Sequence, residues 1–556
     1  MKGAKMLLKC LVEHDVNTVF GYPGGAVLPI YDALYDMKGE LNHVITAHEQ
    51  GAAHAADGYA RSTGKVGVVL TTSGPGATNT VTGIATAYMD SVPIIVIAGQ
   101  VPVSLIGKDS FQEVNIRSIT KAITKKTFII DDVKNIKIIV DEAFKVAMSG
   151  RRGPVVIEMP KNIQNSEYTE GFIKTKDGPN NLCNVEAESV NVKGIDKALE
   201  IINRSKKPLV YAGGGVISSD AEKELYEFVD KLDTPVTCSL MGIGAFPGDR
   251  TNYTGMIGMH GSHSSNYAVT NCDLLIAIGA RFSDRVVSKA ECFAPNAKII
   301  HIDIDEKEFG KNVAVNLNIQ GDVKDVLTSL NSKLQKQYHE EWMKQILNWK
   351  KIRTKKQSIM RGISPRLLLE KLFSVTNGDC IVTTEVGQNQ IWTAQYFKFL
   401  RPRTFITSGG LGAMGFGLGA AIGAAVGNSD KRVINIAGDG SFKMNSTELA
   451  TISKYNLPIV QIILNNHALG MVHQWQELFY DGRFCSTKVE PDVDFVKLGA
   501  AYGIKSVKIT QDAEIDGALE EAFEYNRPMI IECEVGTDVK VFPIVPPGEA
   551  IDKIIG

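Results

Sequence analysis

The sequence predicts an α/β protein made of three doubly wound parallel-sheet domains. Its 556 residues suffice for about three domains of ordinary size. Short apolar runs of strand length alternate with segments of helical character, which is the pattern of parallel sheets covered by helices. Polar and glycine-rich clusters follow several of these runs, at the edge where open α/β sheets bind ligands.

Three segments carry this alternation, and we expect each to fold as a domain. The first covers residues 1–165, the second 190–330 and the third 364–540. A polar stretch at 163–192 is expected to link the first two, and a charged helical connector at 333–361 to precede the third. The tail, 541–556, has three prolines in its first eight residues and cannot be a regular helix.

The expected strands are runs of β-branched and other apolar residues. In order along the chain they are 18–20, 44–46, 66–70, 94–98, 155–157, 208–212, 274–279, 298–305, 433–437 and 459–464. The amphipathic N-terminus reads as a first helix, because it lacks the continuous apolar stretch and the cleavage site of a signal peptide.

Composition and charge exclude several classes of protein. The formal net charge is −2, so nothing favours binding to nucleic acid or to an anionic membrane. Apolar residues make up 44% and charged residues 22%, as in ordinary globular proteins, and no run of 18 apolar residues occurs. The eight cysteines are scattered singly, which is typical of reduced thiols and predicts a cytoplasmic protein.

Two polar clusters stand at the ends of neighbouring predicted strands in the third segment. Gly438-Asp439-Gly440 follows the strand at 433–437, and Asn465-Asn466 follows the strand at 459–464, with a helix expected at 446–455 between them. A Gly-Asp-Gly alone is usually a turn. Here Asn466 lies 27 positions after Asp439, and both lie at strand ends. A carboxylate, an amide and nearby carbonyls are hard ligands that suit Mg²⁺ holding a phosphate.

A carboxylate at a predicted strand-to-helix turn marks the first segment. Glu49 lies between the strand at 44–46 and a small, helix-forming stretch at 50–61. One interpretation is a capping residue, since a helix N-terminus stabilises a carboxylate. The strand-end clusters favour another, because their arrangement resembles the motif that binds thiamine diphosphate (ThDP) and Mg²⁺. In enzymes of that class a glutamate at such a turn activates ThDP across a subunit interface.

The chain as a whole resembles the catalytic large subunits of acetohydroxyacid synthase, also called acetolactate synthase. The segments that carry the resemblance are 19–26, 48–50, 72–76, 109–113, 150–155, 258–261, 281–285, 301–305, 438–441, 465–466 and 471–476. Those at 281–285 and 471–476 separate it best from pyruvate oxidases and decarboxylases. The resemblance implies decarboxylation of pyruvate and its joining to a second 2-ketoacid, pyruvate or 2-ketobutyrate, on the way to valine, leucine and isoleucine.

The resemblance also implies a role for particular residues. Glu49 would activate ThDP, Gln112 and Lys161 would line the substrate channel with Phe111, and Arg285 and Trp475 would form the pocket for the second 2-ketoacid. The implied ligands of Mg²⁺ are Asp439, Asn466 and the carbonyl of Ala468. The residues expected to hold ThDP are Gly25, Glu49, Gln388, Asn389, Met414, Gly440 and Ser441.

A flavin is the third implied cofactor, with a structural role because the reaction has no redox step. The residues expected around FAD are Arg151, Gly213, Gly214, Gly215, Met259, His260, Gly279, Arg281 and Asp303. The triple glycine by itself is a weak signal, since it lacks the Gly-x-Gly-x-x-Gly spacing of a dinucleotide site. A homodimer or larger assembly with interfacial active sites, and a small regulatory subunit, are further expectations.

The sequence differs from its relatives at three notable positions, and three alternative functions stay open. Asn389 stands where relatives often have His, Gly419 where Pro is common, and Ser283 where Asp is frequent. The rivals are an FAD-dependent pyruvate oxidase, an FAD-free catabolic acetolactate synthase, and a non-catalytic scaffold subunit with the ThDP fold. The presence of both Glu49 and Asp439 argues against the scaffold.

Overall fold

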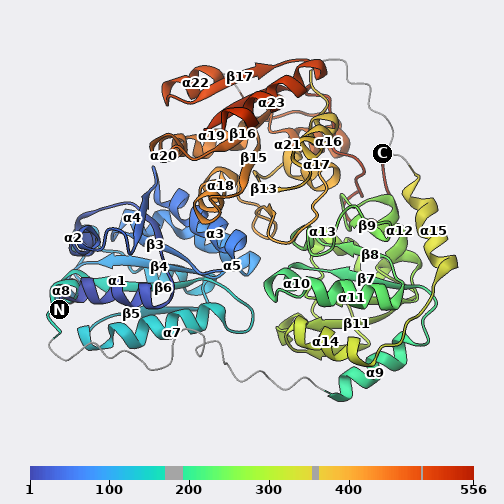
Figure 1. Cartoon of the computed structure of the whole chain (residues 1–556), viewed down its shortest axis with the longest axis horizontal. Coiled ribbons are helices and arrows are strands. Elements are labelled where there is room, and N and C mark those ends of the chain that lie inside the picture. The colour runs from blue at the N-terminus through green and yellow to red at the C-terminus, as the bar shows by residue number, and fades with distance from the viewer. Residues whose placement is uncertain (169–191, 353–361, 490–492) are drawn as a thin grey trace.

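The computed structural model describes residues 1–168, 192–352, 362–489 and 493–556. It contains three six-stranded sheets, and every strand pair within them is parallel. Each sheet with its helices forms a separate lobe in Figure 1, coloured from blue through green to red along the chain. The predicted fold class is therefore confirmed. None of the described helices is long and apolar enough to cross a membrane.

The first sheet has the strand order β2-β1-β3-β4-β6-β5. Its strands are β1 (Thr18–Gly21), β2 (Asn42–Ile45), β3 (Gly67–Thr71), β4 (Ile94–Gln100), β5 (Lys126–Ile129) and β6 (Val155–Pro160). Alternate residues of β4 enter two different cores, so both faces of this sheet are buried under helices. The accompanying helices are α1 (Gly3–Glu13), α2 (Leu28–Asp36), α3 (Glu49–Thr63), α4 (Pro75–Asn79), α5 (Val81–Asp90), α6 (Ile116–Thr120), α7 (Ile136–Met148) and α8 (Lys161–Asn165).

The middle sheet has the order β12-β11-β10-β7-β8-β9. Its strands are β7 (Pro208–Ala212), β8 (Val236–Cys238), β9 (Tyr253–Met256), β10 (Leu274–Ile278), β11 (Lys298–Asp303) and β12 (Leu317–Gln320). Alternate residues of β10 again divide between two cores. The helices of this part are α9 (Val192–Ile202), α10 (Gly214–Ser218), α11 (Glu222–Leu232), α12 (His263–Asn271), α13 (Asp284–Val287), α14 (Val323–Lys333) and α15 (Glu340–Lys350).

The third sheet has the order β14-β13-β15-β16-β18-β17, which repeats the order of the first sheet strand for strand. Its strands are β13 (Cys380–Thr384), β14 (Phe405–Ile406), β15 (Arg432–Gly438), β16 (Ile459–Asn465), β17 (Lys505–Ile509) and β18 (Met529–Glu534). Its helices are α16 (Pro365–Thr376), α17 (Gln388–Tyr396), α18 (Phe416–Gly427), α19 (Asp439–Asn445), α20 (Leu449–Tyr455), α21 (Gly470–Phe479), α22 (Phe495–Ala501) and α23 (Ile515–Tyr525). The sequences of the two parts show no obvious identity, so this internal symmetry becomes visible only in the fold.

The first and third parts pack together through α3 and α18, which lie side by side in Figure 1. Both helices carry small residues at the contact. A β-carbon at Gly58 would collide with the Ala420 backbone, and one at Gly423 would collide with the Ala55 carbonyl. Glycine is therefore required at both positions for the helix backbones to approach so closely. A single hydrophobic core runs through both parts.

Most of the expected strands agree with the structure to within a few residues, but one helix begins earlier than predicted. We expected a helix at 446–455 after a Gly-Asp-Gly turn. Instead α19 starts at Asp439, directly after β15, and a short 3₁₀ turn, η9 (Ser446–Glu448), joins it to α20. The glycine at 438 is the N-cap, so strand and helix adjoin without an intervening turn.

The structure describes only parts of the predicted linker and connector, and all of the predicted tail. The expected linker falls largely on 169–191, outside the described residues, and 353–361 of the expected connector are also outside them. The described part of the connector contains α15, as predicted. The described tail after residue 540 contains no regular helix, and one bridge joins Ile544 to Ile555 within it. The domain boundaries themselves stay predictions.

Candidate active site

Asp439 is buried at the junction of β15 and α19, with 2% of its surface exposed. The backbone amide of Asn466 donates to its carboxylate, so the two predicted metal ligands adjoin. Burial raises the pKa of Asp439 to about 6. Its Oδ1 is buried and has no hydrogen-bond partner among the described residues. An orphaned carboxylate oxygen is costly in a protein interior, and a cation would satisfy it.

The neighbouring amide side chains form a network that fixes Asn466. Its Nδ2 donates to Gln388 Oε1 at 3.0 Å, and its Oδ1 accepts from the Ala468 amide at 3.3 Å. Gln388 in turn donates to Gln474 Oε1 at 3.0 Å. No group of three or more His, Cys, Asp or Glu side chains able to hold a metal occurs in the part of the chain that the structure describes. One carboxylate with amide and carbonyl oxygens fits Mg²⁺ that also takes phosphate oxygens.

Two helices begin at this edge of the third sheet, next to the candidate metal ligands. Both α17, after β13, and α19, after β15, have a glycine N-cap, and Gly387 has a φ of 138°. Ser441 Oγ donates to the Gly438 carbonyl at 3.2 Å. Backbone N–H groups at helix N-termini attract anions, so this edge suits a diphosphate. Gly440 lies in the first turn of α19, where a β-carbon would lie 2.6 Å from the Leu469 side chain, so glycine allows close packing there.

Asn389 contributes less to this edge than we expected. Its Nδ2 donates to the carbonyls of Glu385 at 2.8 Å and Ile436 at 2.9 Å. Both amide hydrogens are therefore used inside the fold, which leaves none for a phosphate. Met414 lies half-buried just before α18, in the loop that follows β14.

Glu49 is the first residue of α3 and is 9% exposed. Asn79 donates to its Oε2 at 2.9 Å, and a β-carbon at Gly76 would lie 3.0 Å from its Oε1. The turn before it is held by Glu448, whose carboxylate accepts from the amides of Ala47 and His48, each at 3.1 Å. The turn that carries Glu49 is thus fixed by a buried side chain of the third part, which the sequence did not single out.

The other predicted residues of the first part also follow strand ends of its sheet. Gly25 is exposed after β1, and Lys161 begins α8 directly after β6. Gln112 has a φ of 58°, and its backbone packs against Gly74, which follows β3. Phe111 beside it is 87% exposed. Glu49, Gln112 and Lys161 therefore share one edge of the first sheet.

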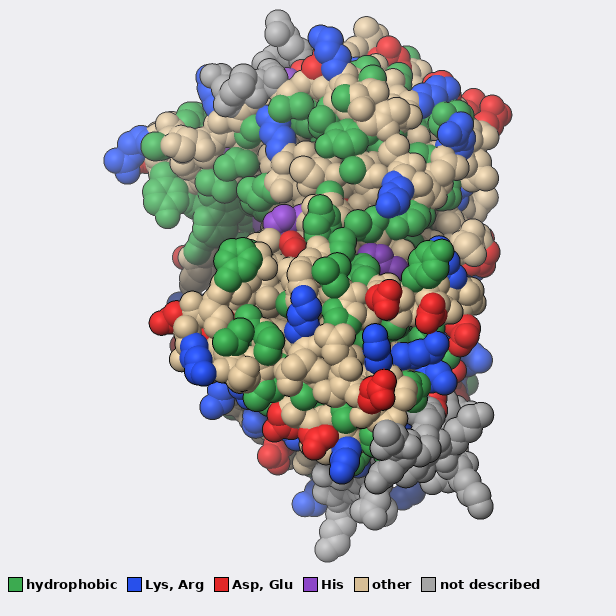
Figure 2. Space-filling view, turned by 90° about the vertical axis from the view of Figure 1, so that its left-hand side faces the viewer, with side chains coloured by type: hydrophobic (Ala, Val, Ile, Leu, Met, Phe, Trp, Pro, Cys, Tyr) green, Lys and Arg blue, Asp and Glu red, His purple; other side chains and the backbone are tan. Residues whose placement is uncertain are grey.

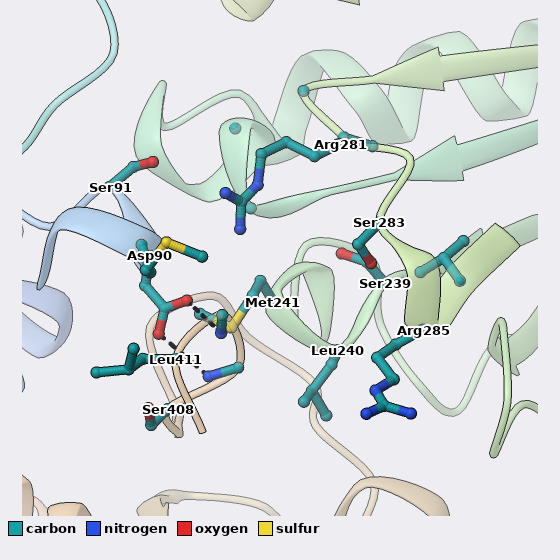
Figure 3. Close-up of a pocket in the computed structure, with 18 of the residues that line it drawn as sticks. Asp90, Ser91, Ser239, Leu240, Met241, Arg281, Ser283, Arg285, Ser408 and Leu411 are labelled. Carbon is teal, nitrogen blue, oxygen red and sulfur yellow. Dashed lines mark hydrogen bonds between the residues drawn. The ribbon is translucent and has the colours of Figure 1, made fainter. Parts of the chain in front are cut away.

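A cavity of about 1630 Å³ lies among the three parts of the chain (Figure 3). Most of the residues expected around a flavin line it, including Arg151 from the first part. Those in the lining are Arg151, Gly214, Gly215, Met259, His260, Gly279, Arg281 and Asp303. Gly213 does not line it; a β-carbon there would collide with the Gly279 carbonyl, so this glycine allows close backbone packing. The volume and the mixed polar lining fit a ligand of dinucleotide size.

Charged side chains reach this cavity from two sides. Arg151 Nη1 contacts Asp305 at 3.3 Å and Glu308 at 3.1 Å, which brings the first part onto the middle part. Arg281 points into the open space of Figure 3. His260 Nδ1 donates to the Pro543 carbonyl at 3.2 Å, and burial lowers the pKa of His260 to about 4. His260 is therefore neutral near pH 7.

Arg285 and Trp475, expected to form one pocket, both line the cavity and contact each other. They come from α13 and α21, and the guanidinium lies 5.9 Å from the centre of the indole ring. The Arg285 side chain is 65% exposed, and its nearest carboxylate, Asp284, is 3.7 Å away. The cation is thus accessible to a carboxylate ligand. Glu49, Gln112, Lys161 and Asp439 do not line this cavity.

Three family models match the chain in order. Residues 1–119 match the N-terminal TPP binding domain of thiamine pyrophosphate enzymes, 195–330 the central domain, and 385–533 the C-terminal TPP binding domain.

Relatives that match along the whole chain are named as acetolactate synthase large subunits. The chain is 46% identical to the probable acetolactate synthase large subunit of Methanocaldococcus jannaschii, over 100% of this chain and 95% of that protein. It is 43% identical to the acetolactate synthase large subunit of Buchnera aphidicola subsp. Schizaphis graminum and 41% identical to the isozyme 3 large subunit of Escherichia coli, in each case over 100% of this chain and 98% of the relative. With this similarity along its whole length, the chain belongs to the family of acetolactate synthase large subunits, which are thiamine-diphosphate enzymes.

Proposed function

We propose that this chain is the catalytic subunit of an acetolactate synthase that decarboxylates pyruvate and joins its two-carbon remainder to a second 2-ketoacid. Pyruvate as acceptor gives 2-acetolactate, and 2-ketobutyrate gives 2-aceto-2-hydroxybutyrate, the precursors of valine, leucine and isoleucine. The observation that carries the proposal is the pairing of Arg285 with Trp475 at 5.9 Å in a chain that also buries Glu49 and Asp439. Thiamine diphosphate, when bound, supplies the electron sink for the loss of CO₂.

Asp439, Asn466 and the Ala468 carbonyl would hold Mg²⁺, and the metal would hold the diphosphate. The orphaned Oδ1 of Asp439 supports this assignment, because a hard cation satisfies a buried carboxylate oxygen. Gln388 fixes the Asn466 amide and would lie beside the diphosphate, with Gly440 and Ser441 at the start of α19. Met414 would support the pyrimidine. We assign Asn389 to the shaping of this edge, since its amide hydrogens are already donated.

Glu49 would hold the proton at N1′ of the aminopyrimidine. Asn79 fixes one of its oxygens, and the absence of a side chain at Gly76 leaves space beside the other. The carboxylate is shielded from water, which strengthens a hydrogen bond to a ring nitrogen. Gly25, Gln112 and Lys161 lie at the same sheet edge and would line the path of the substrate.

Arg285 would bind the carboxylate of the second 2-ketoacid, and Trp475 would pack against its alkyl group. A guanidinium binds a carboxylate through two parallel hydrogen bonds, and an aldehyde could not use that contact. This arrangement favours 2-ketoacids over aldehydes as acceptors.

The cavity would take FAD as a structural cofactor. Arg151, Arg281 and the backbone at Gly214 and Gly215, which line the cavity, would bind its phosphates, and Asp303 would bind a ribose hydroxyl. We assign no redox step to it, because carboligation transfers no electrons to a flavin.

A second copy of the chain would complete the active site. The Glu49 edge and the Asp439 edge belong to different sheets, and neither lines the shared cavity. Apolar side chains are exposed in both parts, among them Tyr22 at 41%, Phe111 at 87% and Met444 at 60%. Figure 2 shows hydrophobic side chains spread over a face that includes both parts. The printed names of the relatives say "large subunit", and we infer a small regulatory partner from them.

Product analysis with pyruvate as the sole substrate tests the proposed function. With ThDP and Mg²⁺ we expect 2-acetolactate and CO₂ in equal amounts, with bound flavin remaining oxidised. A chelator should stop the reaction, and added Mg²⁺ should restore it. Acetate formation coupled to flavin reduction would instead identify a pyruvate oxidase, and the absence of any product would identify a non-catalytic subunit.

A further inference from the structure

The C-terminal end of α5 is a junction of all three parts of the chain, at the wall of the cavity. Asp90, the last residue of α5, bonds to a loop of the third part, and Ser91, its C-cap, accepts from Arg151 Nε at 2.8 Å. Arg151 continues to Asp305 in the middle part. Figure 3 shows Asp90 and Ser91 on one side of the cavity, opposite Arg281 and Arg285.

Both oxygens of the Asp90 carboxylate are engaged. The amide of Gly410 donates to Oδ1 at 2.7 Å, and the amide of Gly409 donates to Oδ2 at 3.1 Å. Arg61 Nη2 also donates to Oδ2, at 2.9 Å. The side chain of Asp90 is fully buried, and that of Arg61 is 10% exposed. Charge-assisted hydrogen bonds to buried groups are short and strong, so this carboxylate is a rigid anchor.

Arg61 holds the same loop at a further point. Its Nη1 donates to the Thr407 carbonyl at 2.9 Å, while its Nε is fixed by Asp57 at 2.6 Å. The loop backbone is thus held at 407, 409 and 410 by two side chains of the first part. Arg61 lies on α3, the helix that begins at Glu49, so the same helix carries the catalytic carboxylate and anchors the loop.

The anchored loop shapes the cofactor sites. Ser408, Gly409, Gly410, Leu411 and Gly412 all line the cavity, and the chain continues to Met414 and then into α18. A β-carbon at Gly410 would lie 2.7 Å from Asp90 Oδ1, and one at Gly409 would collide with the Met241 side chain of the middle part. The loop is therefore wedged between two parts of the protein, and glycine lets it fit.

We propose that Asp90 is a positioning residue: held by Arg61, it fixes the 407–412 loop and through it the place of Met414 at the cofactor. Both oxygens of Asp90 accept hydrogen bonds from protein groups, so Asp90 would act through the loop rather than on the substrate. The inference deepens the proposed function and rests on it for its consequence, which is tight cofactor binding; the anchoring of the loop stands on the contacts alone.

Two variants approach the contact from opposite sides. Asp90→Asn removes the charge and presents an NH₂ group to one of the two loop amides. Gly410→Ala leaves Asp90 intact but brings a methyl group against its Oδ1. Asp132→Asn is the matched control, because Asp132 also accepts a backbone amide, that of Lys134 at 2.9 Å, but on the exposed surface of the first part.

The first measurement is hydrogen–deuterium exchange without substrate. In both variants, but not in the control, we expect faster exchange at 407–412 with unchanged exchange in β4 and β16. The second is the concentration of ThDP that gives half-maximal acetolactate formation, which should rise about tenfold with a smaller change in kcat, as expected for the loss of a charged hydrogen bond.

Unchanged exchange at 409 and 410 would overturn the inference. So would a uniform rise in exchange through the whole protein, or a faster-exchanging loop with unchanged ThDP dependence. A wild-type protein that made no acetolactate would contradict the proposed function instead, and its exchange data would still decide whether Asp90 holds the loop.

Discussion

Arg285 and Trp475 show how far single residues can be assigned before the fold is known. The sequence placed both in the acceptor pocket through family resemblance, and the structure brings them to 5.9 Å from elements that lie far apart in the chain. Asn389 and Gly213 were assigned to cofactor sites in the same way. In the structure, however, the Asn389 amide donates to two backbone carbonyls, and Gly213 packs against the backbone at Gly279. Such tertiary contacts leave no signal in the local sequence.

Trp475→Leu should change which acceptor is used. We expect the variant to retain 2-acetolactate formation but to lose about tenfold of its preference for 2-ketobutyrate, since one methylene contributes about 1–3 kcal/mol in an apolar pocket. Arg285→Lys is the comparison, and it should weaken both acceptors because the carboxylate contact is common to them. The measurement is the ratio of the two products with both ketoacids present. An unchanged product ratio in Trp475→Leu would mean that Trp475 only packs in the core and does not select the acceptor.

His54 should contribute to acid sensitivity. It is fully buried against Phe416, and burial lowers its pKa to about 3. Its stabilising contribution is complete above the unfolded pKa near 6.5 and is lost as pH falls, because only the unfolded chain takes up the proton. His54→Gln should be less stable than wild type at pH 7.5, and the gap should narrow by about 1.4 kcal/mol for each pH unit below 6.5. Urea unfolding midpoints at several pH values measure this; a constant gap would contradict it.

At the scale of elements, the ends of the strands were predictable, but the start of one helix, α19, was not. Buried parallel strands read as apolar runs, so β15 and β16 and the polar clusters after them could be located from the sequence. The start of α19 was missed because Gly-Asp-Gly has the composition of a turn, whereas glycine here is an N-cap. The Asp90 anchor was missed because its partners lie 319 and 320 residues further along the chain.

Gly423→Ala should test the α3–α18 contact. The added methyl group would collide with the Ala55 carbonyl, so we expect the melting temperature to fall by several degrees. Gly517→Ala is the matched control, since Gly517 lies in α23 with open space at its β-carbon. Alanine there should be neutral or stabilising by about 1 kcal/mol, because it restricts the unfolded chain. Equal effects of the two substitutions on thermal melting would show that α3 and α18 are not tightly packed.

At the scale of the whole molecule, the first and third sheets have the same strand order, and we propose that their edges meet between two copies of the chain. In each sheet the strands end at one edge, and Glu49 follows that edge in the first sheet as Asp439 does in the third. The sequence could predict the two edges separately. It could not predict their symmetry, because the two parts share topology without obvious sequence identity.

Complementation between two inactive variants tests this account most directly. Glu49→Gln and Asp439→Ala should each nearly abolish acetolactate formation from pyruvate. Chains of the two variants, unfolded and refolded together with ThDP and Mg²⁺, should recover roughly a quarter of wild-type activity. Random pairing makes half of the dimers mixed, and each mixed dimer has one intact site. Activity no higher than that of either variant alone would place the site within one chain, and near-normal turnover by either variant would remove that residue from the chemistry.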